Sequence, residues 1–313
     1  MIDSSPSPMP LAVRAPDPAA APAVIVAGLD GSPNSVEIAR IGASLGVATG
    51  GRLELVHVLG AGARSLSAPA AEHEQAEALA MLDSLCGSSA CDTSATLVGS
   101  GDPARRIAAV AESARADLIV VGARGTAAVG DALLGSVSSR LAADAPCPVL
   151  VVAPAVAQHV RPESWRARTL VCGFDGSDAA WAAAEQAALL AGRLDGTVSL
   201  VCVGTAVPWR MAEVADALRE ALAARHPGVT APPIDWEVRS GDPAWELECV
   251  ASAITAPLIA VGSRGLGPWR DPLLGSVTRR MLLGARRPIL VMPATAAGDG
   301  ARPQVPGPAG GRS

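Results

Sequence analysis

The sequence contains one pattern written twice, and this internal repeat limits the chain to folds built from two similar units. Asp-Gly-Ser occurs at residues 30–32 and again at 175–177, and Gly-Asp-Pro-Ala occurs at 101–104 and 241–244. The offset between the copies falls from 145 residues at the first motif to 140 at the second, so the first copy holds five extra residues. We place this length change in a surface loop at Gly60–Pro69, a stretch rich in glycine, alanine and serine.

Each copy alternates short apolar runs with longer helical patterns, which is typical of an α/β fold with a parallel sheet and crossover helices. Continuous runs such as Leu118–Val121 favour strands that are covered on both faces. Pro148 and Pro288 open the last run of each copy, and this position suits a strand at a sheet edge. The expected strands are Val24–Ala27, Leu53–Leu59, Ala95–Val98, Leu118–Val121 and Val149–Val152, then Leu170–Phe174, Val198–Val203, Ile234–Val238, Leu258–Val261 and Ile289–Met292.

Helical patterns lie between these runs. Asp102-Pro103 and Asp242-Pro243 have the form of an N-cap aspartate followed by proline at the first helical position, so each pair is expected to open the third helix of its copy. The other predicted helices are Ser35–Leu45, Ala70–Leu85, Ala179–Leu190 and Val207–Ala224.

The repeat also sets the expected domain boundaries. One domain covers residues 23–154 and the other covers 168–293, with a linker at 155–167 in which Trp165 is a candidate anchor to one domain. The tails, 1–22 and 294–313, are rich in proline, alanine and glycine and lack periodicity, so we expect them to be disordered.

Composition excludes several classes of function. The chain contains no lysine, which rules out a P-loop lysine or a Schiff base. A net charge of -5 and only six tryptophans and one phenylalanine argue against a nucleic-acid partner. The six cysteines form no Cys-x-x-Cys pair and are expected to be reduced. Charge or proline interrupts every apolar stretch and no secretory signal is evident, so we expect a cytoplasmic protein with no membrane partner.

A glycine-rich spacing follows the fourth expected strand of both copies: Gly-x-x-Gly, nine residues, then Gly-Ser. In open parallel sheets, ligands bind beyond the carboxyl ends of the strands. Without lysine, a phosphate chain has to be held by backbone N–H groups, serine, arginine and a helix N-terminus. The alternative is a turn with an N-cap serine and a surface arginine. The residues are Gly122, Arg124, Gly125, Gly135 and Ser136 in the first copy and Gly262, Arg264, Gly265, Gly275 and Ser276 in the second.

Asp30 and Asp175 end the first strand of each copy, where a carboxylate can accept hydrogen bonds from ribose or adenine. The alternative is a turn aspartate that caps Ser32 or Ser177. His57 ends the second strand on the expected adenine side, but a core histidine is the favoured interpretation.

These motifs resemble those of the universal stress proteins of the ATP-binding type, here as a tandem of two domains. The resemblance implies two Rossmann-like domains, similar to the adenine nucleotide alpha-hydrolase fold, each a five-stranded parallel sheet of order 3-2-1-4-5. It implies a nucleotide between the first and fourth strands. Gly28, Asp30, Gly173 and Asp175 would then lie beside adenosine, Val58 and Val203 beside adenine, and Ser136, Val137, Ser276 and Val277 beside ribose and phosphates.

The resemblance also implies pairing between last strands, here Val149–Val152 against Ile289–Met292 within the chain, with a homodimer as a further option. The copies differ at Ala127–Val129 and Pro268–Arg270, so equal affinity is not expected.

The function expected from these residues is that of a nucleotide-responsive stress factor that binds ATP, with Mg²⁺ as an option recruited by the phosphates, and has no dedicated catalysis. It would act on a regulatory protein partner that the sequence does not identify. The rivals are a weak ATPase or adenylyl-transfer enzyme on the same fold and an interaction module that has lost its nucleotide. A flavin or nicotinamide protein ranks last, because Gly-x-Gly-x-x-Gly is absent after the first strand.

Overall fold

A computed structural model describes residues 23–59, 68–99, 101–125, 134–157, 165–204, 210–265 and 274–294. Several expectations fall outside these ranges: the tails apart from Ala294, residues 60–67 of the predicted loop, residues 158–164 of the linker, and the divergent segments 127–129 and 268–270. None of the described helices is long and apolar enough to cross a membrane.

The strands follow the expected runs closely. Those of the last pair coincide with the prediction, and the others differ by one or two residues at an end. The first copy forms β1 (Val24–Leu29), β2 (Arg52–Val58), β3 (Thr93–Val98), β4 (Leu118–Gly122) and β5 (Val149–Val152). The second forms β6 (Thr169–Gly173), β7 (Thr197–Val203), β8 (Ile234–Arg239), β9 (Ile259–Gly262) and β10 (Ile289–Met292).

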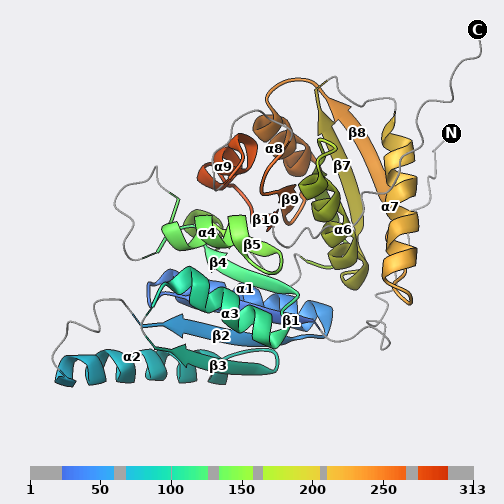
Figure 1. The fold of residues 1–313 in the computed structure, drawn as a ribbon. Coiled ribbons are helices and arrows are strands. Elements are labelled where there is room, and N and C mark those ends of the chain that lie inside the picture. The colour runs from blue at the N-terminus through green and yellow to red at the C-terminus, as the bar shows by residue number, and fades with distance from the viewer. Residues whose placement is uncertain are drawn as a thin grey trace, which may run out of the picture.

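All ten strands join into one sheet of order β3-β2-β1-β4-β5-β10-β9-β6-β7-β8 (Figure 1). Numbered within its own copy, each half has the order 3-2-1-4-5. Neighbouring strands are parallel within each half, and β5 and β10 are antiparallel. The expected pairing of the last strands within the chain is therefore present, and it fuses the two sheets.

The β5–β10 register is centred on one pair of repeat counterparts, Leu150 and Leu290. The flanking pairs, Val149 with Val291 and Val151 with Ile289, are exchanged with each other when the two halves are exchanged. The two halves are thus related by a local pseudo-twofold axis that passes between these two leucines. The expectation of a sheet edge at Pro148 and Pro288 is wrong, because both prolines precede central strands. They are tolerated there because each stands just before the first residue of its strand, where the missing N–H removes no hydrogen bond within the strand. Their carbonyl groups still accept hydrogen bonds, from Ile119 N–H at 2.9 Å and from Ile259 N–H at 3.2 Å.

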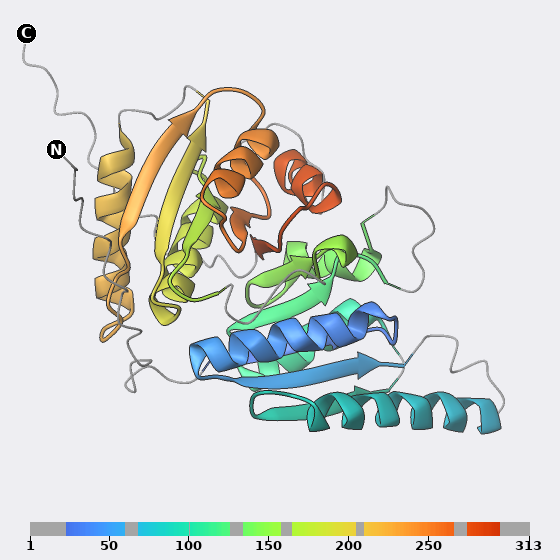
Figure 2. The same cartoon turned by 180° about the vertical axis from the view of Figure 1, so that it is seen from behind.

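Helices cover both faces of the sheet. The helices α1, α2, α6 and α7 pack in one hydrophobic layer and α3, α4, α8 and α9 in the other, and each layer contains residues of both halves. Figure 1 shows α3 in front of the first half, and Figure 2 shows α1 on the opposite side. The bounds are α1 (Asn34–Thr49), α2 (Ala68–Gly87), α3 (Pro103–Ala114), α4 (Ser136–Asp144), α5 (Pro154–Ala157), α6 (Asp178–Arg193), α7 (Met211–Arg225), α8 (Pro243–Ala253) and α9 (Ser276–Leu283).

Several helix boundaries differ from the sequence prediction, among them the end of α1, at Thr49 rather than Leu45. The helix α2 begins at Ala68, inside the stretch expected to be a loop, and α7 begins at Met211 rather than Val207. The short helix α5 occupies the start of the predicted linker. Trp165, at the end of that linker, is fully buried and donates its indole N–H to Ser44 Oγ at 2.8 Å. The expected anchor is confirmed, and it attaches the second half to α1 of the first.

The two Asp-Pro pairs cap their helices as predicted. Asp102 accepts hydrogen bonds from the N–H groups of Ala104 and Arg105, and Asp242 accepts one from Trp245 N–H. Each aspartate also pairs with an arginine of the neighbouring helix, Arg140 or Arg280. The Arg280 hydrogen bond and the Trp245 N–H lower the pKa of Asp242. For Asp102, burial is the largest single effect and raises the pKa, but the N–H of Arg105, the charge and hydrogen bond of Arg140 and the N–H of Ala104 together outweigh it, so the pKa is lowered.

Replacing either cap, as Asp102→Ala or Asp242→Ala, is expected to lower the free energy of unfolding by about 1 kcal/mol. The ordinary aspartate value is 3.8 and the folded pKa lies below it, so this stabilisation is present above the unfolded value and is lost as pH falls through the folded value. Urea unfolding at pH 7 and below pH 4 measures both effects. Glu112→Ala, an exposed change on α3, should alter stability little at either pH, and an equal loss there would refute the capping role.

Candidate functional site

A tight turn at the carboxyl end of the first strand of each copy carries the predicted aspartate. Gly31 and Gly176 have positive φ values of 78° and 83°, which favour glycine. Asp30 Oδ1 accepts hydrogen bonds from Ser32 N–H at 3.0 Å and Ser35 Oγ at 3.1 Å. Asp175 Oδ1 accepts one from Ser177 N–H at 2.9 Å. One oxygen of each carboxylate, Oδ1, therefore caps the turn, as the alternative interpretation predicted.

The second oxygen of each aspartate faces the glycine loop that follows the fourth strand. A Cβ built on Gly125 would lie 2.7 Å from Asp30 Oδ2, and one built on Gly265 would collide with Asp175 Oδ2. The backbone at Gly125 and Gly265 therefore approaches the carboxylate so closely that it leaves no room for a side chain. Two predicted parts of the site, far apart in sequence, meet in the same way in both copies.

Hydrogen bonds close each glycine loop onto the helix that follows. Gly135 N–H donates to Ala123 O and Gly275 N–H to Ser263 O, both at 2.8 Å. Because of this closure, α4 and α9 begin beside their loops, with Ser136 and Ser276 exposed at the first helical position. Neither helix has a side-chain cap at its N-cap glycine, so the first turn offers N–H groups and the positive end of the helix dipole to an anion.

Three hydroxyl groups that shape the site were not predicted. Ser35 Oγ supports the Asp30 turn and accepts hydrogen bonds from Gly31 N–H at 3.1 Å and Asp30 N–H at 3.3 Å. Ser138 Oγ donates to Ala123 O at 3.0 Å, and Thr278 Oγ1 donates to Gly262 O at 2.7 Å. The last two could have been found from the repeat, because a hydroxyl residue follows the Gly-Ser pair by two positions in both copies.

The remaining predicted residues lie at various depths around the loops. A Cβ on Gly28 would lie 2.8 Å from Ile107 Cδ1, and one on Gly173 would lie 2.9 Å from Leu247 Cδ1. These two glycines therefore let α3 and α8 pack closely on the sheet. Val58, Val137, Val203 and Val277 pack against the same hydrophobic layer. Arg124 is half-buried and Arg264 is exposed, each next to its loop.

Gly122 and Gly262 occupy equivalent positions in different surroundings. A Cβ on Gly262 would lie 2.7 Å from Ala179 Cβ and 2.8 Å from the Ala179 carbonyl carbon, so α6 packs directly on this glycine. A Cβ on Gly122 would meet only the Arg124 carbonyl oxygen of its own loop, at 3.1 Å, before more distant atoms. Gly262 is thus needed for packing as well as for the loop.

The surroundings of the two turns also differ. His57 is buried and its Nδ1 lies 3.0 Å from Leu29 O, as expected for a core histidine. Its counterpart is Cys202, whose pKa is raised by burial and by the charge of Asp175. Burial raises the pKa of Cys172, under the same turn, to about 12. Among the described residues all cysteines are free, and no group of side chains has the composition of a metal site.

Buried hydroxyl groups without a hydrogen-bond partner occur at both edges. They belong to Ser32, in the first turn, and Ser263, in the second loop where the first copy has Ala123. An unpaired buried hydroxyl costs free energy unless a ligand or water satisfies it. Together with the carboxylate of Asp30 or Asp175 beside its glycine loop, these atoms fit a ligand that carries several hydroxyl and phosphate groups.

Comparison with known proteins gives consistent matches over both halves. The model of the universal stress protein family matches residues 23–153 and 166–293. A universal stress protein of Mycobacterium tuberculosis is 35% identical over 197 residues, which is 57% of this chain and 62% of that relative. One of Thermus aquaticus is 34% identical over 139 residues, 41% of this chain and 96% of its own length. The chain thus spans about three fifths of the length of the mycobacterial relative.

Solved structures agree on the fold. The crystal structure of a universal stress protein from Archaeoglobus fulgidus superposes with a TM-score of 0.67 at 21% identity, covering 86% of this chain and 98% of that one. A putative universal stress protein from Pseudomonas aeruginosa superposes with a TM-score of 0.52 at 17% identity, covering 88% of this chain and 94% of that one.

The contrast between Gly122 and Gly262 gives a matched pair of variants. Gly262→Ala forces a methyl group against α6 and is expected to lower the free energy of unfolding by about 1–3 kcal/mol. Gly122→Ala should cost less, because the nearest atom belongs to its own loop and can shift. Thermal and urea unfolding of both variants measure the difference. Equal losses would show that α6 does not determine the requirement at Gly262.

Proposed function

The chain belongs to the universal stress protein family, and on this basis we propose that it binds ATP at the Asp–glycine-loop junction of each half and acts as a nucleotide-responsive regulator. The single observation that carries the proposal is the approach of Asp30 to Gly125, repeated at Asp175 and Gly265. A carboxylate beside a glycine loop at the carboxyl edge of a parallel sheet is suited to a nucleotide, whose ribose donates hydrogen bonds and whose phosphates accept them.

The parts of ATP find matching groups along this edge. Ribose hydroxyls would donate to Asp30 or Asp175. The phosphates would accept hydrogen bonds from loop N–H groups, from Ser136 or Ser276, and from the first turn of α4 or α9. Arg124 and Arg264 lie beside the loops and would add charge, while Val58 and Val203 end the strand next to the expected adenine. This arrangement supplies the binding that a lysine provides in a P-loop.

Binding without dedicated catalysis is part of the proposal. In the first copy, Asp30 Oδ1 already accepts two hydrogen bonds, which suits an orienting carboxylate better than a general base. Mg²⁺ would be recruited by the phosphates, since the described residues include no cluster of ligands for a metal of their own. A weak ATPase or adenylyl-transfer activity is the rival, and an assay of ATP hydrolysis by the purified chain separates the two.

Regulation requires that ATP bind two states of the protein with different affinity. The exposed helix starts beside each loop are the elements that a bound phosphate chain would order. A cytoplasmic regulatory protein that recognises the ordered loop is the partner we propose, and a homodimer is a second possible assembly.

Calorimetric titration with ATP is expected to give two sites per chain. Gly125→Val fills the gap beside Asp30 and should remove the first site, and Gly265→Val should remove the second. Asp30→Ala should weaken the first site by roughly ten- to a hundredfold, as expected for the loss of hydrogen bonds to a charged group. Gly87→Ala is the control, because a Cβ there meets no atom within 4 Å.

Denaturing the purified protein and analysing the released small molecules by mass spectrometry identifies a nucleotide that co-purifies. A protein that carries no nucleotide and also fails to bind added ATP would refute the proposal and favour the interaction module. Two unaffected sites in Gly125→Val and Gly265→Val would refute the position of the site but leave ATP binding intact.

A further inference from the structure

A small apolar recess lies where the two halves meet, between the carboxyl-terminal ends of α1 and α6. It has a volume of about 60 Å³, and Ile25, Leu45, Leu118, Leu190 and Leu290 are among its lining residues. It opens into a wider cavity of about 580 Å³, and Asp117, Gln186 and Arg193 line both spaces. The wider cavity falls within the size range of small-molecule sites, which often occur between domains.

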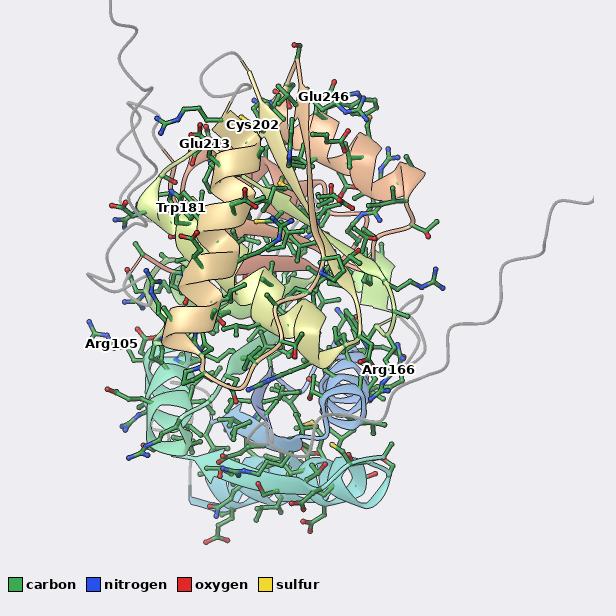
Figure 3. All side chains as sticks on the ribbon, turned by 90° about the vertical axis from the view of Figure 1, so that its right-hand side faces the viewer. Arg105, Arg166, Trp181, Cys202, Glu213 and Glu246 are labelled. Atoms are coloured by element: carbon green, nitrogen blue, oxygen red, sulfur yellow. The ribbon has the colours of Figure 1, made fainter. Side chains whose placement is uncertain are left out.

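The pseudo-twofold axis identifies what fills the equivalent position on the other side. Repeat alignment relates Leu189 and Arg193 of the recess to Ser44 and Ala48 of α1. Ser44 Oγ accepts the Trp165 indole N–H at 2.8 Å, and Ala48 O accepts a hydrogen bond from Arg166 at 3.0 Å. Trp165 is fully buried there, and Arg166 lies beside α1 where the halves meet (Figure 3). The recess is thus the symmetry counterpart of the position that the Trp165 indole ring occupies beside Ser44, which we call the Trp165 seat.

Among the described residues, no tryptophan lines the recess. In the aligned sequence the counterpart of Trp165 is Ala20, which lies outside the described residues and has only a methyl side chain. Trp165 therefore fills one of two related positions, and the other is a recess lined mainly by apolar side chains.

The mouth of the recess differs from that of the Trp165 seat in its charge. Leu189 replaces the hydroxyl of Ser44, which makes the inner wall more apolar, and Arg193 replaces Ala48 at the mouth. The Arg193 guanidinium lies 3.5 Å from Asp117 of the other half, a long ion pair in which both side chains are partly exposed. An anionic group at the mouth would give Arg193 a closer partner, with two parallel hydrogen bonds available to a carboxylate or sulfonate.

We propose that this recess and its mouth form a binding site for a small aromatic anion. The ring lies in the recess, in the place that Trp165 fills on the other side, and the carboxylate or sulfonate pairs with Arg193. The site is distinct from both nucleotide edges and takes one ligand per chain. A ligand there contacts α1 and α6 together, and these helices begin directly after the Asp30 and Asp175 turns.

The test uses 8-anilinonaphthalene-1-sulfonate as an aromatic anion and indole as a neutral ring, with the folded full chain and saturating ATP to keep the probe from nucleotide sites. Fluorescence and calorimetric titrations are expected to give one site per chain for each probe. Leu189→Trp should fill the recess and weaken both probes at least tenfold. Leu79→Trp, which adds the same ring at an exposed position of α2, should change neither affinity.

Two further variants separate the ring from the charge and test the symmetry argument. Arg193→Gln should weaken the sulfonate at least fivefold and leave indole binding unchanged. Trp165→Ala should open the second seat and raise the indole stoichiometry from one to two, with a cooperative thermal transition as the check on folding.

Absence of one-site binding in the unmodified chain, or equal affinities in Leu189→Trp and Leu79→Trp, would overturn the proposal. Deletion of residues 1–22 tests whether this segment, rather than a small molecule, occupies the recess. Probe binding that becomes more than tenfold tighter after the deletion would also overturn the proposal. The comparison of Leu189→Trp with Leu79→Trp holds whether or not ATP binds, because both variants keep the same two nucleotide edges.

Discussion

The antiparallel pairing of β5 with β10 determines how everything else in this protein is arranged. Each half on its own is a five-stranded parallel sheet with one unpaired edge at its last strand. The pairing, centred on Leu150 and Leu290, satisfies both edges at once and continues each helical layer across the junction. Exposed β-edges attract other chains, so this contact removes two of the four edges that separate domains would have. The remaining edges are β3 and β8.

The same pairing sets the direction in which each candidate nucleotide site opens. Within a half, all carboxyl ends lie on one side, where the Asp turn and the glycine loop meet. Since β5 and β10 are antiparallel and the sheet twists, these sides face different directions, towards the left for the first half and towards the top for the second in Figure 1. Two nucleotides would therefore occupy separate surroundings, and communication between them would have to pass through the shared sheet or through α1 and α6.

Much of the fold could be predicted because the repeat provided every signal twice. Strands such as Val149–Val152 were located from continuous apolar runs, and Asp102 and Asp242 were recognised as caps from the proline that follows. The proximity of Asp30 to Gly125, and of their counterparts, could be predicted because parallel strands bring their carboxyl ends together. The sheet-edge position expected for Pro148 and Pro288 was wrong. A rule that considers only the residues around a proline cannot foresee that β5 pairs with β10 of the other half.

Other features depend on contacts that no local pattern encodes. The role of Ser35 requires knowing that the turn folds back over the first residues of α1. The difference between Gly122 and Gly262 arises from the distance of α6, which is set by the alanines of that helix rather than by the loop. Trp165 was expected to anchor the linker to one domain. That it contacts α1 could not be predicted, because this contact depends on how the two halves join into one sheet. All three features depend on packing between segments that are distant in sequence, and such packing is determined only by the complete fold.

Trp165 fills the position beside α1, whereas the equivalent position beside α6 is a recess, and this difference bears on how such a protein can evolve. In a dimer of identical chains, every substitution appears on both sides of the axis, so a tryptophan that closed one seat would close both. A chain that carries both halves covalently can change one side alone. Trp165 and Ala20 are such a difference. A chain with two covalently joined halves can therefore secure them with one tryptophan and leave the equivalent position beside α6 to the proposed ligand, which a symmetric assembly of the same size could not do.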